Sequence, residues 1–133
     1  MSTPQPVTLS SDSISIAFDG RSLTAELPRD VVSWLAARPR IVALLRELAA
    51  DPKFRRRLVN GAALRDLVLL LYARGTGVAP YLVARRFSTS HEQLYRMERG
   101  LKKDGLYDMV LGVLGLLELD ERTARDGLRR PTA

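Results

Sequence analysis

The sequence has no cysteine and a single histidine, His91, which excludes most metal and thiol chemistry. Without cysteine there is no disulfide and no thiolate zinc site, and one imidazole cannot form a histidine cluster or a Cys–His catalytic pair. Its acidic residues form no helically spaced pair in an apolar setting. Gly75-x-Gly77 lacks the third glycine and the preceding strand of a dinucleotide-binding loop. We therefore expect a protein that is not an enzyme and that holds no metal and no cofactor.

Long hydrophobic runs are also missing. The longest, residues 109–117, is too short to cross a bilayer, and the N-terminal residues lack the basic region and apolar core of a signal peptide. We expect a cytoplasmic protein without membrane contact. A length of 133 residues fits one domain with enough chain to bury a core.

Positive charge is abundant and unevenly placed. The net charge is +6, and residues 53–103 hold 12 Lys and Arg against 3 Asp and Glu. Both flanking segments are slightly acidic. A cationic segment of this kind is what binding to phosphates requires.

The patterning predicts one mainly α-helical domain that begins with a β-hairpin. We expect residues 1–12 to form a flexible tail, residues 13–119 the domain and residues 120–133 a charged C-terminal tail. Apolar residues alternate on both sides of Asp19-Gly20 within residues 13–27, and this pair favours a two-residue type I′ turn. The turn sets the register, which pairs Phe18 with Arg21, Ile16 with Leu23 and Ile14 with Ala25.

Helical spacing of apolar residues predicts the helices that follow. One helix begins after Pro28 and another after Pro39, and residues 62–74 form a third that is apolar nearly all round. Such a helix lies at the centre of a core or between subunits. The basic segment 53–59 is either an exposed helical turn or a phosphate-contacting patch.

The most specific pattern covers residues 78–105. Pro80 suits the first turn of a short helix, a tight turn follows at Ser88-Thr89, and Ser90 with Gln93 fits a capping box that starts a second helix. The apolar stripe of this second helix is Leu94, Met97 and Leu101. The opposite side carries His91, Glu92, Tyr95, Arg96 and Arg99.

This segment resembles the helix-turn-helix superfamily of DNA-binding domains, some of which carry a wing, over about residues 80–105. Ala84 occupies the position where the family has a small residue, which lets the two helices cross closely. The apolar anchors are matched by Val83, Phe87, Leu94 and Met97. Ser88 stands where the family usually has glycine, and Thr89 where it usually has an apolar residue.

The resemblance implies a helix-turn-helix unit at residues 79–104 whose second helix enters the major groove. On that recognition helix the implied DNA-binding residues are Ser90, His91, Glu92, Tyr95, Arg96 and Arg99. Phosphate contacts would come from Arg85, Arg86, Lys102 and Lys103, and the segment Arg55, Arg56 and Arg57 could add to them.

Two structural alternatives remain around the motif. The recognition helix either ends near Arg99 or continues through Gly100 to Lys103. Residues 107–119 would form a wing in a winged-helix protein, but no turn pair separates two alternating runs, so we expect a helix. Its expected buried side is Met109, Val110, Val113, Leu116 and Leu117.

Double-stranded DNA is the expected ligand. Because one such unit reads only a few base pairs, we expect a homodimer joined through the hairpin or the helix at residues 109–119, with transcriptional regulation as the commonest use of the module. The alternative is a protein–protein adaptor, or an accessory subunit of a partition, recombination or replication complex, with apolar faces at residues 41–48 and 109–119. RNA binding is disfavoured because exposed aromatic residues are few.

Overall fold

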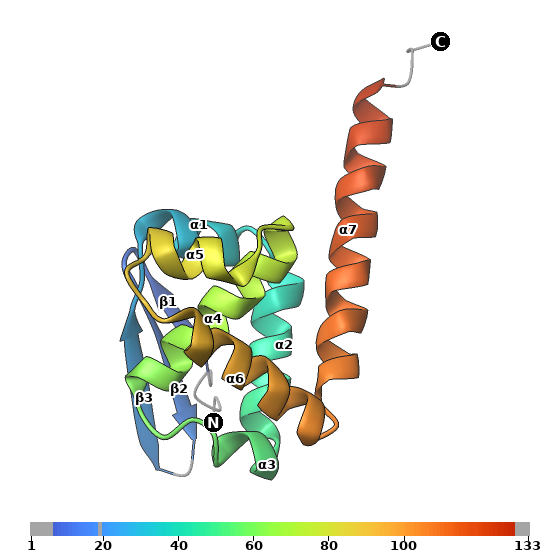
Figure 1. The fold of residues 1–133 in the computed structure, drawn as a ribbon. Helices are drawn as coiled ribbons and strands as arrows, with labels where there is room; N and C mark the ends of the chain where they lie inside the picture. The colour runs from blue at the N-terminus through green and yellow to red at the C-terminus, as the bar shows by residue number, and fades with distance from the viewer. Residues whose placement is uncertain (1–6, 19, 130–133) are drawn as a thin grey trace.

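The structure is a computed structural model that describes the backbone of residues 7–18 and 20–129 and side chains as far as residue 126. The described chain forms three strands followed by seven helices (Figure 1). The strands are β1 (Val7–Ser10), β2 (Ser13–Phe18) and β3 (Arg21–Glu26). The helices are α1 (Arg29–Ala36), α2 (Pro39–Ala50), α3 (Pro52–Arg55), α4 (Gly61–Thr76), α5 (Pro80–Arg86), α6 (His91–Lys103) and α7 (Tyr107–Arg129). The prediction of a mainly α-helical chain with an N-terminal hairpin is confirmed.

The hairpin of β2 and β3 has the predicted register. Phe18 pairs with Arg21, Ile16 with Leu23 and Ile14 with Ala25. The side chains of Ile14 and Ile16 are fully buried, as the alternation of apolar residues requires. Gly20 has the positive φ that favours glycine, whereas Asp19 lies outside the described residues.

A third strand corrects the prediction of a flexible tail at residues 1–12. Strand β1 pairs antiparallel with β2, so that Val7 lies opposite Ile16 and Leu9 opposite Ile14. Val7 and Leu9 alternate with polar residues and continue the apolar face of the hairpin, and a two-stranded hairpin alone is marginal in water. Residues 1–6 lie outside the described part of the chain.

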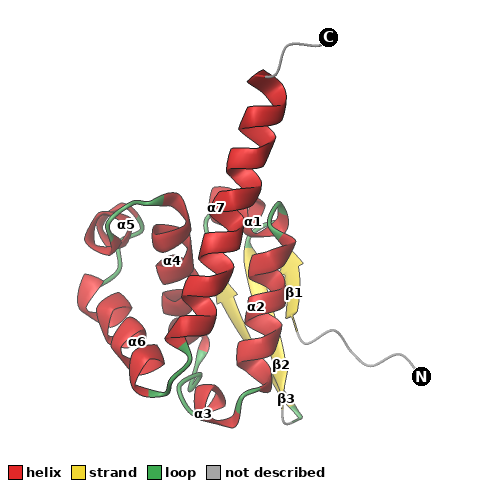
Figure 2. Cartoon of the chain, turned by 90° about the vertical axis from the view of Figure 1, so that its right-hand side faces the viewer, coloured by secondary structure: helices red, strands yellow, loops and turns green. Residues whose placement is uncertain are grey.

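Helix α4 lies at the centre of the molecule, as its all-round apolar character predicts. Strand β3 covers one side of it, and α5, α6 and α7 contact the others (Figures 1 and 2). The buried apolar residues of α4 are Leu64, Leu67, Val68, Leu69, Leu70, Leu71 and Ala73. Helices α1 and α2 contact the sheet, and α1 also contacts α4.

The apolar residues of α2 belong to this core. Ile41, Leu44, Leu45 and Leu48 are all buried within the domain. Their burial contradicts the alternative in which residues 41–48 present an apolar face to another subunit. The apolar stripe of α2 is used internally because β1, β2 and α7 contact this helix.

Residues 107–119 form a helix, as predicted, but the prediction of its buried side was wrong at one position. The helix continues to Arg129, so most of the expected C-terminal tail is helical and projects beyond the rest of the molecule (Figures 1 and 2). Leu116 is 45% exposed, although Val110 and Leu117 are buried as predicted. Residues 130–133 lie outside the described residues.

Two ion pairs hold α7 beyond its buried side. The Arg38 guanidinium lies 3.2 Å from the Glu121 carboxylate, and that of Arg40 lies 2.6 Å from Asp120. These pairs join the start of α2 to the segment that we expected to be a tail. They contact α7 within about one turn after Leu117, its last buried leucine.

Candidate nucleic-acid interface

Helices α5 and α6 and the turn between them form one unit that packs on α4. The backbone N–H of Thr89 donates to the Ala84 carbonyl at 2.9 Å, which ties the turn to α5. From α4, the Arg65 guanidinium donates to the Phe87 carbonyl at 2.8 Å. The turn is therefore fixed both to its own first helix and to the central helix.

Ser88 has the backbone conformation that the tight turn demands. Its φ of +54° is left-handed, and among the described residues it is the one non-glycine residue with a positive φ. Glycine favours this conformation because it has no Cβ to crowd the following carbonyl. Ser88 thus adopts a conformation that glycine favours.

The capping box predicted at the start of α6 does not form. Ser90 has the extended backbone of an N-cap residue, but its side chain accepts no hydrogen bond from the helix. Residues 90–93 are all exposed, so water can satisfy the free N–H groups of the first turn. These N–H groups remain available to an anion.

The inner side of α6 is buried as its apolar stripe predicts. Leu94 and Leu101 are fully buried and Met97 nearly so. Ala84 of α5 is also buried at the contact between the two helices, where a larger side chain would hold them apart. The stripe fixes which side of α6 faces outward.

The outer side of α6 carries the residues predicted for DNA contact. His91, Glu92, Arg96 and Arg99 are exposed, and Tyr95 is half-buried with its ring edge-on to that of His91 at 6.1 Å. Ser90, Arg85, Lys102 and Lys103 are exposed beside them.

Several of these cations have no partner within the described residues. Arg85, Arg96 and Arg99 form neither an ion pair nor a hydrogen bond there. Arg86 differs, because its guanidinium pairs with Asp30, donates to the Tyr72 hydroxyl and lies over the Phe87 ring. The unpaired arginines are thus Arg85 of α5 and Arg96 and Arg99 of α6, whereas Arg86 helps to hold α5 in place.

In the basic segment before α4, some cations make contacts within the domain and others are exposed. Arg55 donates to the Ala50 carbonyl at 2.9 Å, and Arg57 pairs with Asp104 at 2.5 Å. Lys53 and Arg56 are exposed. A groove of about 440 Å³ lies between this segment and α6, and its lining includes Arg56, Arg57, Gln93, Arg96 and Met97.

A second groove, of about 640 Å³, opens between α5 and α6. It is lined by Tyr81, Ala84, Arg85, Thr89, His91 and Tyr95. Hydroxyl, imidazole and guanidinium groups therefore meet at the entrance to the turn. Such groups donate hydrogen bonds to phosphate oxygens.

Helix α6 continues through Gly100 to Lys103, which settles the alternative about its end. A Cβ at this position would lie under 3.0 Å from the Arg57 guanidinium. Glycine therefore leaves room for Arg57 to pass over the helix and pair with Asp104. This pair lowers the pKa of Asp104, mainly through the hydrogen bond from Arg57.

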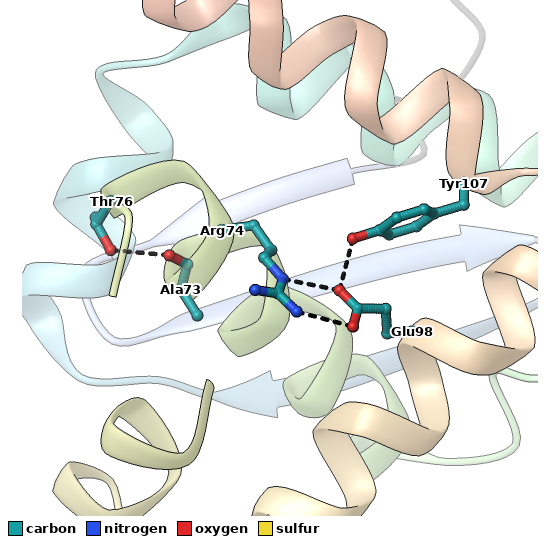
Figure 3. Close-up of polar contacts among 5 residues, drawn as sticks. All are labelled: Ala73, Arg74, Thr76, Glu98 and Tyr107. Atoms are coloured by element: carbon teal, nitrogen blue, oxygen red, sulfur yellow. Dashed lines mark hydrogen bonds and ion pairs between the residues drawn. The ribbon is translucent and has the colours of Figure 1, made fainter. Parts of the chain in front are cut away.

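Figure 3 shows a polar network that joins three helices on the inner side of α6. Glu98 of α6, 5% exposed, accepts hydrogen bonds from both Nε and an Nη of Arg74 at 2.8 and 2.9 Å. The Tyr107 hydroxyl of α7 donates to the same carboxylate at 2.6 Å. The network holds α6 against α4 and α7.

Burial and hydrogen bonding oppose one another at this carboxylate. Burial acts to raise the pKa of Glu98, but the hydrogen bonds from Arg74 and Tyr107 outweigh it and the pKa lies below its ordinary value. Burial and the bond to Glu98 raise the pKa of Tyr107 to about 12. The network therefore holds an ionised carboxylate and a neutral phenol at neutral pH.

Sequence reasoning missed this network, although one signal for it was present. Glu98 lies four residues after Leu94 and three before Leu101, so helical spacing already places it beside the buried stripe. Its partners could not be inferred, because Arg74 lies on another helix and is 24 residues distant.

Comparison of the chain with family profiles, with curated proteins and with solved structures gave no match. No helix within the described residues combines the length and apolar character needed to cross a bilayer. Those residues also hold no group of three or more His, Asp or Glu side chains arranged to bind a metal.

Proposed function

We propose that this protein binds duplex DNA through α5, the turn and α6, with α6 as the recognition helix of a helix-turn-helix unit. One observation carries the proposal: the outward side of α6 presents the unpaired Arg96 and Arg99, while its inward side is fixed by Leu94, Met97 and the Glu98 network. A rigid helix with free hydrogen-bonding side chains is what reading base edges in the major groove requires.

The roles of the residues follow from their positions. His91, Arg96 and Arg99 would read base edges, assisted by Glu92 and Tyr95. Phosphates would be held by Ser90, Arg85, Lys102, Lys103 and Arg56. Arg86 is already paired with Asp30 and bonded to Tyr72, and would contribute to phosphate binding through its remaining N–H groups.

The biological role that we propose is transcriptional regulation in the cytoplasm by a homodimer. A single recognition helix contacts only a few base pairs, so two copies are needed for a site of useful length. The positive φ of Ser88 supports the assignment of the turn, because the chain departs from the family pattern in residue type and keeps the conformation that glycine favours.

A double variant tests the proposal. Replacing Arg96→Ala and Arg99→Ala should weaken binding to duplex DNA at least roughly 30-fold, since each specific base contact contributes about 1–3 kcal/mol. Fluorescence anisotropy with labelled duplexes measures the loss.

A charge-matched variant provides the control. Arg46 and Arg125 are exposed on α2 and α7 and make no ion pair with described residues, so Arg46→Ala with Arg125→Ala removes the same charge elsewhere. Its affinity should stay within about threefold of the unaltered protein. Equal losses in the two double variants would contradict the assignment of α6 as the recognition helix.

A protein adaptor is the second candidate. The observation that favours it is the exposure of Leu111, Leu116 and Leu119 on α7. An adaptor would bind a protein partner through these leucines and keep that binding in the Arg96→Ala, Arg99→Ala variant.

A further inference from the structure

Helix α7 has a second apolar side that its own domain does not cover. Leu111, Leu116 and Leu119 are 49%, 45% and 57% exposed. Gly112 and Gly115 lie among them, and a Cβ added at either would meet nothing within 4 Å. At about 100° per residue these five positions fall within roughly 140° of the helix circumference, opposite the side that packs on the core.

Charged residues extend this uncovered side at both ends. Asp108 lies one turn before Leu111 and Gly112, and Arg122 lies one turn after Leu119; both are exposed. Their separation of fourteen positions corresponds to about 21 Å along the helix. Between residues 108 and 122 the side is therefore negative at one end, apolar in the middle and positive at the other end, and the exposed Asp126 follows one turn after Arg122.

We propose that this side pairs with the same side of a second copy of the chain, antiparallel about a two-fold axis at Gly115. In that register Leu111 of each copy lies opposite Leu119 of the other. Asp108 of each copy lies opposite Arg122 of the other, which gives two ion pairs across the dimer. Gly115 meets itself at the crossing, where the absence of a side chain lets the helices approach closely.

The charges favour a second copy of the chain as the partner, and an antiparallel arrangement of the two helices. A parallel pair would place Asp108 beside Asp108 and Arg122 beside Arg122, and like charges in contact oppose association. The antiparallel pair satisfies both ends at once, and a second copy supplies the complement automatically. Arg122 already donates to Glu118 in its own helix at 2.7 Å, and its guanidinium has further N–H groups for a second carboxylate.

The hairpin, which is the other interface that we expected, packs on its own domain. Ile14 and Ile16 are fully buried in the domain, so the apolar side of the sheet is already covered. The leucines of α7 therefore supply the uncovered apolar surface that the hairpin lacks.

This inference rests on the homodimer included in the proposed function and names its surface. It is tested without DNA, so that its failure and the failure of DNA binding can be distinguished. A monomer that still binds DNA would overturn the dimer alone, and a dimer that binds no DNA would overturn the proposed function alone.

Cysteine cross-linking tests the register, because the natural chain has no cysteine. We expect Gly115→Cys to form a disulfide-linked dimer under mild oxidation, since the two introduced thiols face each other. Asp108→Cys is the matched control on the same side, and its two thiols would lie about 21 Å apart in the antiparallel pair. Non-reducing gels should show a dimer for the first variant and a monomer for the second.

The other results would overturn the proposal. Cross-linking of both variants would indicate a parallel pair. If light scattering shows that the Gly115→Cys variant is a dimer and it still does not cross-link, the crossing at Gly115 is excluded. Light scattering of the unaltered chain should give twice its mass of 14.8 kDa, and a monomeric mass across the micromolar range would exclude the dimer. The variant Leu111→Glu with Leu119→Glu should be monomeric with an unchanged circular dichroism spectrum, since both side chains are exposed.

Discussion

Glu98 helps to fix the orientation of α6 on the domain. Its carboxylate is buried, yet three hydrogen bonds from α4 and α7 satisfy it. Such a group stabilises one arrangement of helices, because any rotation of α6 would leave a buried charge without partners. By fixing the rotation of α6 about its axis, this contact keeps the positions of Arg96 and Arg99 on the outer side.

Replacing Glu98→Gln should lower the free energy of unfolding by roughly 2 kcal/mol. Breaking a fully buried ion pair costs about 3–5 kcal/mol, and the value here is smaller because the Arg74 side chain remains about one-third exposed. Urea denaturation at neutral pH measures the change. Glu118→Gln, which breaks the exposed pair with Arg122, is the matched control and should cost no more than about 0.5 kcal/mol.

The same residue predicts how stability depends on pH. The pKa of Glu98 is lower in the folded protein than its ordinary value of 4.5, so the folded state binds its proton less readily than the unfolded state. Its contribution is therefore complete above that ordinary value and is lost as the pH falls through the lower folded pKa. The stability difference between the natural chain and Glu98→Gln should shrink on acidification, and a difference that stays constant to pH 2 would contradict the assignment.

Among the helices and strands, the features that the sequence predicted are those that depend on the spacing of neighbouring residues. The register of β2 with β3 followed from Asp19-Gly20 and the alternation around it, and the central place of α4 followed from leucines on every side. The same kind of reasoning located the outward side of α6. These features depend on residues within a few positions of each other.

The failures involve contacts between distant residues. Strand β1 was missed because four residues show little pattern until β2 is beside them. The exposure of Leu116 could not be foreseen, because helical spacing alone does not choose between two apolar sides of α7. Just past residue 119 the acidic residues of α7 pair with Arg38 and Arg40, and those arginines lie some 80 positions earlier.

Packing between α1 and α4 gives a prediction at this scale. Replacing glycine by alanine inside a helix usually stabilises it by about 1 kcal/mol, but a Cβ at Gly75 would lie under 3.0 Å from the Trp34 ring. Gly75→Ala should therefore destabilise the protein by about 1–3 kcal/mol through overpacking. Thermal denaturation measures the loss.

A second substitution checks the cause of that loss. The clashing atoms belong to the six-membered ring of the Trp34 indole, and a smaller phenyl ring in its place would leave space. Gly75→Ala should therefore cost less in a Trp34→Phe background than in the natural chain. An equal cost in both backgrounds would show that the contact with Trp34 is not responsible.

For the whole molecule, folding separates cations that are neutralised from cations that are not. Acidic residues of α7 take Arg38 and Arg40, Asp30 takes Arg86, and Asp104 takes Arg57. The outer side of α6 keeps its positive charge because Arg96 and Arg99 form no ion pair with described residues. A net charge of only +6 thus leaves a concentrated cationic surface where the proposed recognition helix lies.

The most direct test of DNA binding is the affinity of the unaltered protein for random-sequence duplex DNA across a salt series. Each phosphate contact releases counterions and contributes about −0.9 to the slope of log affinity against log salt concentration. We predict a steep linear fall with a slope that corresponds to at least about three phosphate contacts. No binding at the lowest salt concentration, or an affinity that salt does not change, would contradict the assignment of α5 and α6 as a DNA-binding surface.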